Sequence, residues 1–373
     1  MNALAKEVWD VAVVGAGLAG SLSALLLAER GLRVLLLDRA TFPRAKVCGC
    51  CLNGNALAAL RAAGLGDLVA RLGAVPLRRV RLAAGPRQAT LPLAQGVSVS
   101  RWALDAALLA EAQARGVTFW PGTPVRLDPE ESGETRRLWR GQQPIAARLV
   151  IAADGLGGTL AGAAPAEPGS RIGAGAVLPG HPFYQAGEIF MTTGAEGYLG
   201  LVRLEDGQLD LACALDREAC RRAGGPAALA ERLLQRAGWP LPAGLHEAAW
   251  RGTPALTRTA RRLAGHRLFV VGDAAGYVEP FTGEGMAWAL GSAVALAPLA
   301  AQPWHPRAAQ RWHLLHRRIV GARQLPCRFL AAALRRPWLM AACIAMLKCW
   351  PSLAQPLTRF LNRPAPVVPR DNS

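Results

Sequence analysis

The residues that could do chemistry begin with a glycine fingerprint, Gly15-x-Gly17-x-x-Gly20, and an acid, Asp38. Gly15 allows a tight turn, Gly17 lets the backbone approach a pyrophosphate, and Gly20 lets a helix pack against a strand. Asp38 lies where such sites place an acid that accepts hydrogen bonds from a ribose. The fingerprint therefore predicts a dinucleotide site.

The elements that must position this site follow in the expected order. Residues 8–38 have the pattern of a strand, a helix over Ser21–Arg30 and a second strand. The helix N-terminus would offer free N–H groups and a positive dipole end to the phosphates. Glycines alone also make ordinary turns, so the order of strand, glycines, helix, strand and acid is what makes the prediction specific.

Three further segments end a strand with an acid or open a helix with an arginine. They are Leu149-Val-Ile-Ala-Ala-Asp154-Gly155, Leu268-Phe-Val-Val-Gly272-Asp273 with Pro280-Phe-Thr-Gly283-Glu284-Gly285 after it, and Arg101-Trp-Ala-Leu-Asp105. Asp-Gly and Gly-Asp pairs also make turns in any protein, which is the structural alternative for Asp154 and Asp273. Four motifs in one order make a shared site the better interpretation.

With these motifs the sequence resembles the para-hydroxybenzoate-hydroxylase-like flavoproteins, and within them the geranylgeranyl reductase branch. The resemblance covers residues 9–60, 98–160 and 265–295. It implies that the dinucleotide is FAD. It also implies an α/β fold, with a Rossmann-like FAD-binding domain of the glutathione-reductase type, an inserted antiparallel β-sheet substrate domain and a helical C-terminal segment. The expected boundaries are 1–75 with 98–162 and 255–305, then 76–97 with 163–254, then 306–373.

The resemblance also implies roles for single residues. Arg101 and Arg44 would pair with the pyrophosphate, and the backbone of Val125 would meet the adenine. Asp154 and its neighbour would lie by the pyrophosphate, and Asp273 would accept hydrogen bonds from the ribityl hydroxyls. The other residues expected to bind the cofactor are Ala19, Arg39, Cys48, Gly49, Gly155, Gly272, Pro280, Gly283, Glu284, Gly285 and Met286.

Cys48 and Tyr198 are the candidate catalytic residues. Cys48 belongs to a Cys-Gly pair that resembles the reductase branch, where it lies close to the flavin ring. A reactive thiol needs a lowered pKa, which Arg44 and Lys46 could supply, and the alternative is a packed small residue. Tyr198 could line the substrate pocket, or be an ordinary buried strand tyrosine. Its strand lacks the tryptophan typical of the reductase branch.

Composition limits the other possibilities. The 8 cysteines are irregularly spaced, and the C-x-C-C run that ends at Cys51 has no zinc spacing, so no metal site and a reducing cytoplasm are expected. The formal charge is +17, and no acid occurs between Glu284 and Asp371. This basic C-terminal segment could be a solvated helical surface or a peripheral membrane contact. Nucleic-acid binding is not expected, because no recognition fold accompanies the charge.

These observations predict an FAD-dependent oxidoreductase that acts on a hydrophobic, isoprenoid- or polyketide-like molecule. In a reductase, reduced FAD would give hydride to a double bond. In a monooxygenase, a flavin hydroperoxide would hydroxylate an aromatic or quinoid ring. A third alternative is a non-catalytic flavin-binding partner protein. An NAD(P)H electron donor would have to bind without a second GxGxxG unit, and the sequence leaves the oligomeric state open.

Overall fold

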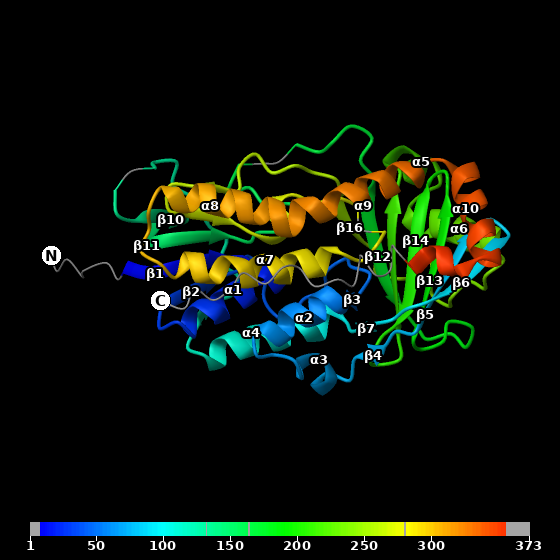
Figure 1. Cartoon of the computed structure of the whole chain (residues 1–373), viewed down its shortest axis with the longest axis horizontal. Coiled ribbons are helices and arrows are strands. Elements are labelled where there is room, and N and C mark those ends of the chain that lie inside the picture. Colours follow the sequence, from blue (N-terminus) through cyan, green and yellow to red (C-terminus); the bar gives the residue numbers. More distant parts are fainter. Residues whose placement is uncertain (1–7, 132, 163–164, 280, 356–373) are drawn as a thin grey trace.

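The computed structural model describes residues 8–131, 133–162, 165–279 and 281–355, and it shows two sheets joined by long helices (Figure 1). The first sheet has the strand order β17-β18-β11-β1-β2-β8, with β10 and β9 added beside β11. Its strands are β1 (Val8–Val14), β2 (Val34–Leu37), β8 (Thr118–Trp120), β9 (Arg126–Leu127), β10 (Arg136–Arg140), β11 (Gln143–Ala152), β17 (Ala264–Gly265) and β18 (Leu268–Val270). Five of them, β1, β2, β8, β11 and β18, run parallel.

Helices cover this parallel sheet and form its largest core. They are α1 (Leu18–Ala28), α2 (Gly54–Ala62), α3 (Leu68–Arg71), α4 (Arg101–Ala114) and α7 (Gly285–Ala300). α1 contacts both α4 and α7 and is almost wholly buried, which agrees with the absence of a polar face on this helix. Ser100 caps α4 by accepting the backbone N–H of Ala103 at 3.1 Å. α2 and α3 are separate helices, because Gly64 takes a left-handed conformation (φ 73°) that ends α2.

The second sheet has the strand order β16-β12-β15-β14-β13-β5-β6. Its strands are β5 (Arg79–Ala84), β6 (Arg87–Pro92), β12 (Ile172–Leu178), β13 (Glu188–Gly194), β14 (Gly197–Arg203), β15 (Leu209–Leu215) and β16 (Arg251–Ala255). All neighbours are antiparallel except β13 and β5, which are parallel and join two segments far apart in the chain. The expected α/β fold with an antiparallel sheet domain is confirmed.

Each face of the second sheet packs against helices. α5 (Arg217–Arg222) precedes α6 (Pro226–Ala237), and α6 packs on the face that bears Leu199 and Leu215. Tyr198 and Ala214, one position earlier on β14 and β15, point to the other face, where α10 packs. A small third sheet, β3-β7-β4, links the two parts through β3 (Cys51–Asn53), β4 (Val75–Pro76) and β7 (Gly96–Ser98).

The C-terminal helices connect the two sheets along one side of the molecule (Figure 1). They are α8 (Arg307–His316), a π-helical turn η2 (Arg317–Gly321), α9 (Ala322–Ala333), α10 (Pro337–Cys349) and a short turn η3 (Pro351–Ala354). Trp312 of α8 is buried and donates its ring N–H to the carbonyl of Val270 at 3.1 Å. Within the described ranges no single helix is long and apolar enough to cross a membrane. The bent pair Arg307–Ala333 and Pro337–Cys349, at 108°, meets that length and composition test together.

Candidate cofactor and substrate site

The glycine fingerprint forms the turn between β1 and α1. Gly15 has φ +105°, and a Cβ there would lie 2.2 Å from the carbonyl oxygen of Ala153. Its backbone N–H donates to Leu37 at 2.7 Å, which ties the turn to the end of β2. A Cβ at Gly17 would meet only the Arg44 guanidinium, at 3.5 Å. The turn is therefore closed toward the protein and shaped to bring bare backbone next to a ligand.

Asp38 follows β2 and turns back to the same fingerprint. One carboxylate oxygen accepts the backbone N–H of Ala16 at 2.7 Å, and the other accepts that of Ala40 at 2.8 Å. These bonds hold the carboxylate beside the first turn, where a ribose would need an acceptor. The position of the acid agrees with the prediction from its spacing.

A buried cluster of charges lies next to the fingerprint. Arg101, at the start of α4, donates two hydrogen bonds of 2.8 Å to Asp105, and both side chains are buried. Arg44 approaches Asp105 at 3.7 Å and Asp38 at 4.0 Å. The charges of two arginines and two carboxylates balance here, and the arginine N–H groups that the carboxylates do not use are donors that suit a pyrophosphate. Sequence reasoning missed the holding role of Asp105.

Asp273 and the start of α7 form the other end of the predicted cofactor site. The Asp273 carboxylate accepts a hydrogen bond from Lys46 Nζ at 3.1 Å, across 227 residues of sequence. Gly272 has φ 63°, and a Cβ there would lie 2.8 Å from the Cβ of Ala19. Only glycine lets this strand end approach α1 so closely. Sequence reasoning considered Lys46 only as a neighbour of the thiol and missed its pairing with Asp273.

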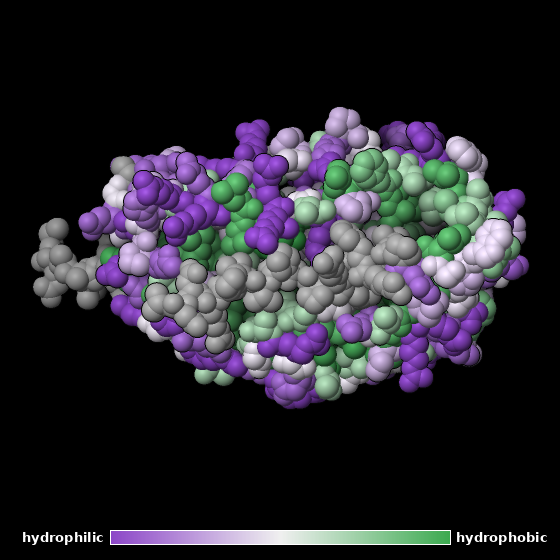
Figure 2. All heavy atoms as spheres, in the orientation of Figure 1, coloured by the Kyte–Doolittle hydropathy of each residue, from purple (hydrophilic) through white to green (hydrophobic). Residues whose placement is uncertain are grey.

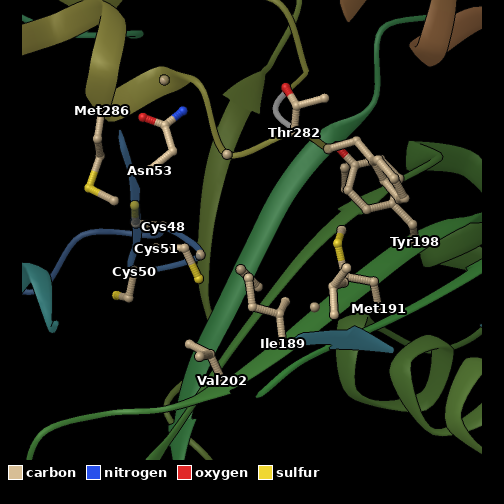
Figure 3. A pocket seen from close by; sticks show the side chains of 18 of the residues that line it. Cys48, Cys50, Cys51, Asn53, Ile189, Met191, Tyr198, Val202, Thr282 and Met286 are labelled. Atoms are coloured by element: carbon tan, nitrogen blue, oxygen red, sulfur yellow. The ribbon is translucent and has the colours of Figure 1, made fainter. Parts of the chain in front are cut away.

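One cavity of about 570 Å³ joins this end to the second sheet and the C-terminal helices. Figure 3 shows residues around the same space from α7, from the second sheet and from the loop with Cys48, Cys50 and Cys51, here called the cysteine loop. The predicted cofactor residues that line it are Ala19, Cys48, Gly49, Arg101, Gly155, Gly272, Asp273, Gly283, Gly285 and Met286. Tyr198 also lines it, with Ile189, Met191 and Val202 from the sheet and Leu330, Ala333, Met340 and Ile344 from α9 and α10.

Other predicted residues lie outside the cavity wall. Asp154 accepts the backbone N–H groups of Thr159 and Leu160 at 2.8 and 3.0 Å, so it also makes the turn chemistry that was its alternative. Glu284 is buried at the start of α7, where Asn53 and Trp288 donate to it at 2.7 and 3.1 Å. The rest of this group is Gly15, Gly17, Gly20, Asp38, Arg39, Arg44 and Val125. Pro280 lies outside the described residues.

The cysteine loop places three thiols on the cavity wall. A hydrogen bond from the Cys50 thiol, together with the charge of Arg101, lowers the pKa of Cys48 to about 5, against the opposing effect of burial. The bond to Cys48 and burial raise the pKa of Cys50. Cys50 also has φ 49°, a rare conformation for a side chain with a Cβ. The cause expected from Arg44 and Lys46 is therefore wrong, because Cys50 and Arg101 shift the pKa instead.

Tyr198 contributes a polar group to an otherwise apolar wall. Its ring packs edge-to-face on Phe281 at 5.1 Å, and its hydroxyl is buried with no hydrogen-bond partner among the described residues. Burial raises the pKa of Tyr198 well above its ordinary value, so the phenol stays protonated. Tyr198 is therefore both a buried strand tyrosine and a residue that lines the cavity.

The parallel sheet and the glycine turn with its acid define a dinucleotide-binding protein, and an apolar cavity adjoins the cofactor end. Residues 8–314 match the FAD binding domain family, and the chain belongs to that family. The cofactor is therefore FAD. The glycine turn and the neighbouring arginines fit its pyrophosphate, and Gly283 and Gly285 line the cavity.

Relatives and solved structures agree with an FAD-dependent oxidoreductase. The chain is 28% identical over 315 residues to digeranylgeranylglycerophospholipid reductase 2 of Methanothermobacter thermautotrophicus, across 79% of this chain and 78% of that protein. Flavin-dependent brominase Bmp2 matches with a TM-score of 0.77 at 17% identity, over 95% of this chain and 94% of that one. PqsL, a probable FAD-dependent monooxygenase from Pseudomonas aeruginosa, matches at 0.72 and 19%, over 90% and 99%. These two structures support the fold alone.

Proposed function

We propose that this enzyme is a reductase, which uses reduced FAD to saturate a double bond in a hydrophobic, isoprenoid-like substrate. The observation that carries the proposal is the composition of the cavity. Away from the cofactor end its walls are apolar, with side chains such as Leu82, Met191, Leu330 and Ile344. Such a surface favours a hydrocarbon chain, because it removes apolar area from water and offers few polar partners.

The cofactor would be held by the residues already described. The fingerprint and the Arg101 cluster would bind the pyrophosphate, Asp38 the ribose, and Asp273 the ribityl chain. When bound, reduced FAD supplies the hydride that the double bond accepts. Lys46 holds Asp273 in place through its 3.1 Å hydrogen bond. Gly49 lines the cavity with open space at its Cβ position, so the cysteine loop can lie close to a flat ring.

The proton that completes such a reduction needs a protonated group on the cavity wall. Tyr198 meets this requirement, since burial raises the pKa of its phenol and its hydroxyl has no protein partner within the described ranges. Cys48 does not meet it, because a thiol with a pKa of about 5 is a thiolate at neutral pH. We therefore assign Tyr198 the proton-donor role, and Cys48 a negative charge beside the cofactor.

The named relative supports the reductase proposal. Digeranylgeranylglycerophospholipid reductase 2 is, by its name, a reductase of an isoprenoid lipid, and it aligns over most of both chains. The second sheet departs from the reductase branch, because β14 carries Gly-Tyr-Leu-Gly-Leu-Val-Arg with no tryptophan. That departure favours monooxygenase chemistry as the second candidate function.

A single-turnover experiment separates the two functions. The FAD-loaded protein is reduced chemically in the absence of oxygen and mixed with a geranylgeranyl lipid. Mass spectrometry then measures the mass of the product. A reductase yields a product that has gained two hydrogens in the absence of oxygen. A product that forms only after oxygen is admitted, and that has gained one oxygen atom, would establish the monooxygenase instead. Repeating the reduction with NADH or NADPH tests the predicted electron donor.

A further inference from the structure

The C-terminal helices carry most of the large apolar side chains that the described residues expose. Of eleven such side chains, seven lie between Leu314 and Leu353. Phe329 and Trp338 are each 70% exposed, and Trp350 is 62% exposed. Figure 2 shows hydrophobic side chains gathered over the end of the molecule that α9 and α10 occupy in Figure 1. A patch of this kind marks an interaction surface.

The exposed side chains are spaced so that each helix shows one apolar face. On α9, Leu325, Phe329 and Ala332 are exposed and recur at helical spacing. On α10, Trp338, Ala342 and Met346 are exposed at intervals of four residues. A surface helix of a water-soluble domain normally turns polar side chains outward. These two helices present apolar faces instead.

The opposite face of α10 closes the cavity. Met340 and Ile344 are buried and line it, and α10 packs across β5 and β6. α10 is therefore apolar on both sides, with one side toward the cavity and the other away from the protein. A buried ion pair fixes the start of this wall, since Arg171 donates to Glu279 at 3.0 Å and to the carbonyl of Leu334 at 3.2 Å.

Positive charge surrounds the exposed apolar faces. Arg317, Arg318, Arg336 and Lys348 are exposed, and none of them forms an ion pair among the described residues. The sequence between Glu284 and Asp371 contains no acid that could offset them. Anionic lipid headgroups attract such basic residues, and tryptophan rings favour the boundary between headgroups and acyl chains.

We propose that the exposed faces of α9 and α10 dock on the surface of an anionic lipid bilayer. The apolar side chains insert among the lipids, while the flanking arginines and Lys348 contact the headgroups. In this orientation α9 and α10 lie between the bilayer and the cavity, so a lipid substrate reaches the cavity along these helices. The docking rests only on the surface of the protein, whereas this delivery of substrate rests on the proposed function.

Vesicle binding by the full-length, FAD-loaded protein tests the docking without any turnover. The protein should sediment with vesicles of phosphatidylcholine and phosphatidylglycerol at low salt, and much less with vesicles of phosphatidylcholine alone. Trp338→Ser combined with Trp350→Ser should weaken the binding. Neutralising one arginine, as in Arg336→Gln, should weaken the vesicle binding about fivefold. Each basic residue near an anionic membrane surface strengthens the binding by about that factor.

Trp102 provides the matched control, because it is 54% exposed on α4, in the other part of the molecule. Trp102→Ser should bind vesicles like the unchanged protein. The proposal is wrong if anionic vesicles do not bind the protein, or if Trp102→Ser lowers the binding as much as the double substitution does. A stable dimer that loses self-association in the double variant and never binds vesicles would assign the face to a second copy of the chain.

Discussion

At the cofactor end of the cavity the walls are glycines and paired charges, whereas at the helical end they are apolar side chains from α9 and α10. Gly272 and Gly285 each leave little room for a side chain, and Arg101 and Lys46 are each held by a carboxylate. The helical end has no such constraint in its lining, and its outer surface is apolar as well. The first end suits a polar group, and the proposed function assigns the second to a hydrocarbon.

The two ends should therefore tolerate amino-acid substitutions differently. A rigid polar site depends on few positions, so one added methyl group can remove its function. An apolar wall depends on volume, so most hydrophobic substitutions change how well a substrate fits without unfolding the protein. Substitutions at the cofactor end should therefore change FAD content, and substitutions at the helical end should change substrate use alone.

Gly15→Ala should have the largest effect. The new Cβ would lie 2.2 Å from the Ala153 carbonyl oxygen at a φ that alanine rarely adopts, so the turn must move. We expect almost complete loss of FAD and destabilisation by about 4 kcal/mol or more, the size typical of a forced backbone change. FAD content of the purified protein and its thermal unfolding measure both effects. Gly291→Ala is the control, because its Cβ would have open space. Retained FAD in Gly15→Ala would refute the assigned turn.

Substitution of two buried arginines, one at each end of the cavity, compares the two ends more directly. Arg101→Gln leaves Asp105 buried beside the fingerprint, and Arg171→Gln leaves Glu279 buried under α9. Each should lower the free energy of unfolding by about 1–3 kcal/mol, because each carboxylate loses its closest partner but keeps a second arginine, Arg44 beside Asp105 and Arg335 beside Glu279. Only Arg101→Gln should also weaken FAD binding.

Urea unfolding and an FAD titration measure these two effects. Arg221→Gln serves as the control, since that arginine is exposed and pairs with Glu218 on the surface. An Arg171→Gln variant that releases FAD as readily as Arg101→Gln would abolish the distinction between the ends.

Gly200→Leu should act on substrate alone. Gly200 lines the cavity on β14, and the nearest neighbours of an added Cβ are the Met191 side chain and the Phe190 carbonyl, both at 3.9 Å. The added Cβ would make only ordinary van der Waals contacts, and the rest of a leucine side chain would occupy part of the apolar space. We expect about a tenfold loss of kcat/KM for a geranylgeranyl lipid, equivalent to about 1.4 kcal/mol, with unchanged FAD content. Unchanged kinetics would place the substrate elsewhere.

The smallest expected effect is the pH dependence of Cys48. Because its pKa is lowered to about 5, the thiolate persists at neutral pH and is lost as the pH falls through that value. Alkylation by iodoacetamide should therefore stay fast at pH 7 and slow markedly between pH 6 and 4. Mass spectrometry of peptides reports the rate, with the exposed Cys349 thiol as the reference in the same sample. Equal pH profiles for the two cysteines would contradict the thiolate.

Local signals in the sequence predict much of the cofactor end and of the secondary structure. Helix α6 shows such signals at both ends, since Pro226 suits its first turn and Gly238 takes the left-handed conformation (φ 68°) that ends it. The glycine turn and Asp38 lie together because a strand, a helix and a strand bring them together. These features need only neighbours that are close in sequence.

The rest depends on contacts between distant segments. Lys46 meets Asp273 across 227 residues, and no motif marks that pairing. Asp210 of β15 is buried close to the Cys48 and Cys50 thiols. The alternating pattern of this strand does not indicate which loop packs against it. The helical wall of the cavity is likewise absent from any motif, because α10 is apolar all round and its sequence does not say which face packs inward.

The central claim is that one cavity holds the flavin ring at one end and an apolar substrate at the other. A titration of the FAD-loaded protein with geranylgeraniol, followed by the visible spectrum of the flavin, tests this claim directly. We expect the flavin spectrum to change saturably as geranylgeraniol is added, and Gly200→Leu should make this change smaller at a given concentration. Binding of geranylgeraniol with no change in the flavin spectrum would contradict the claim.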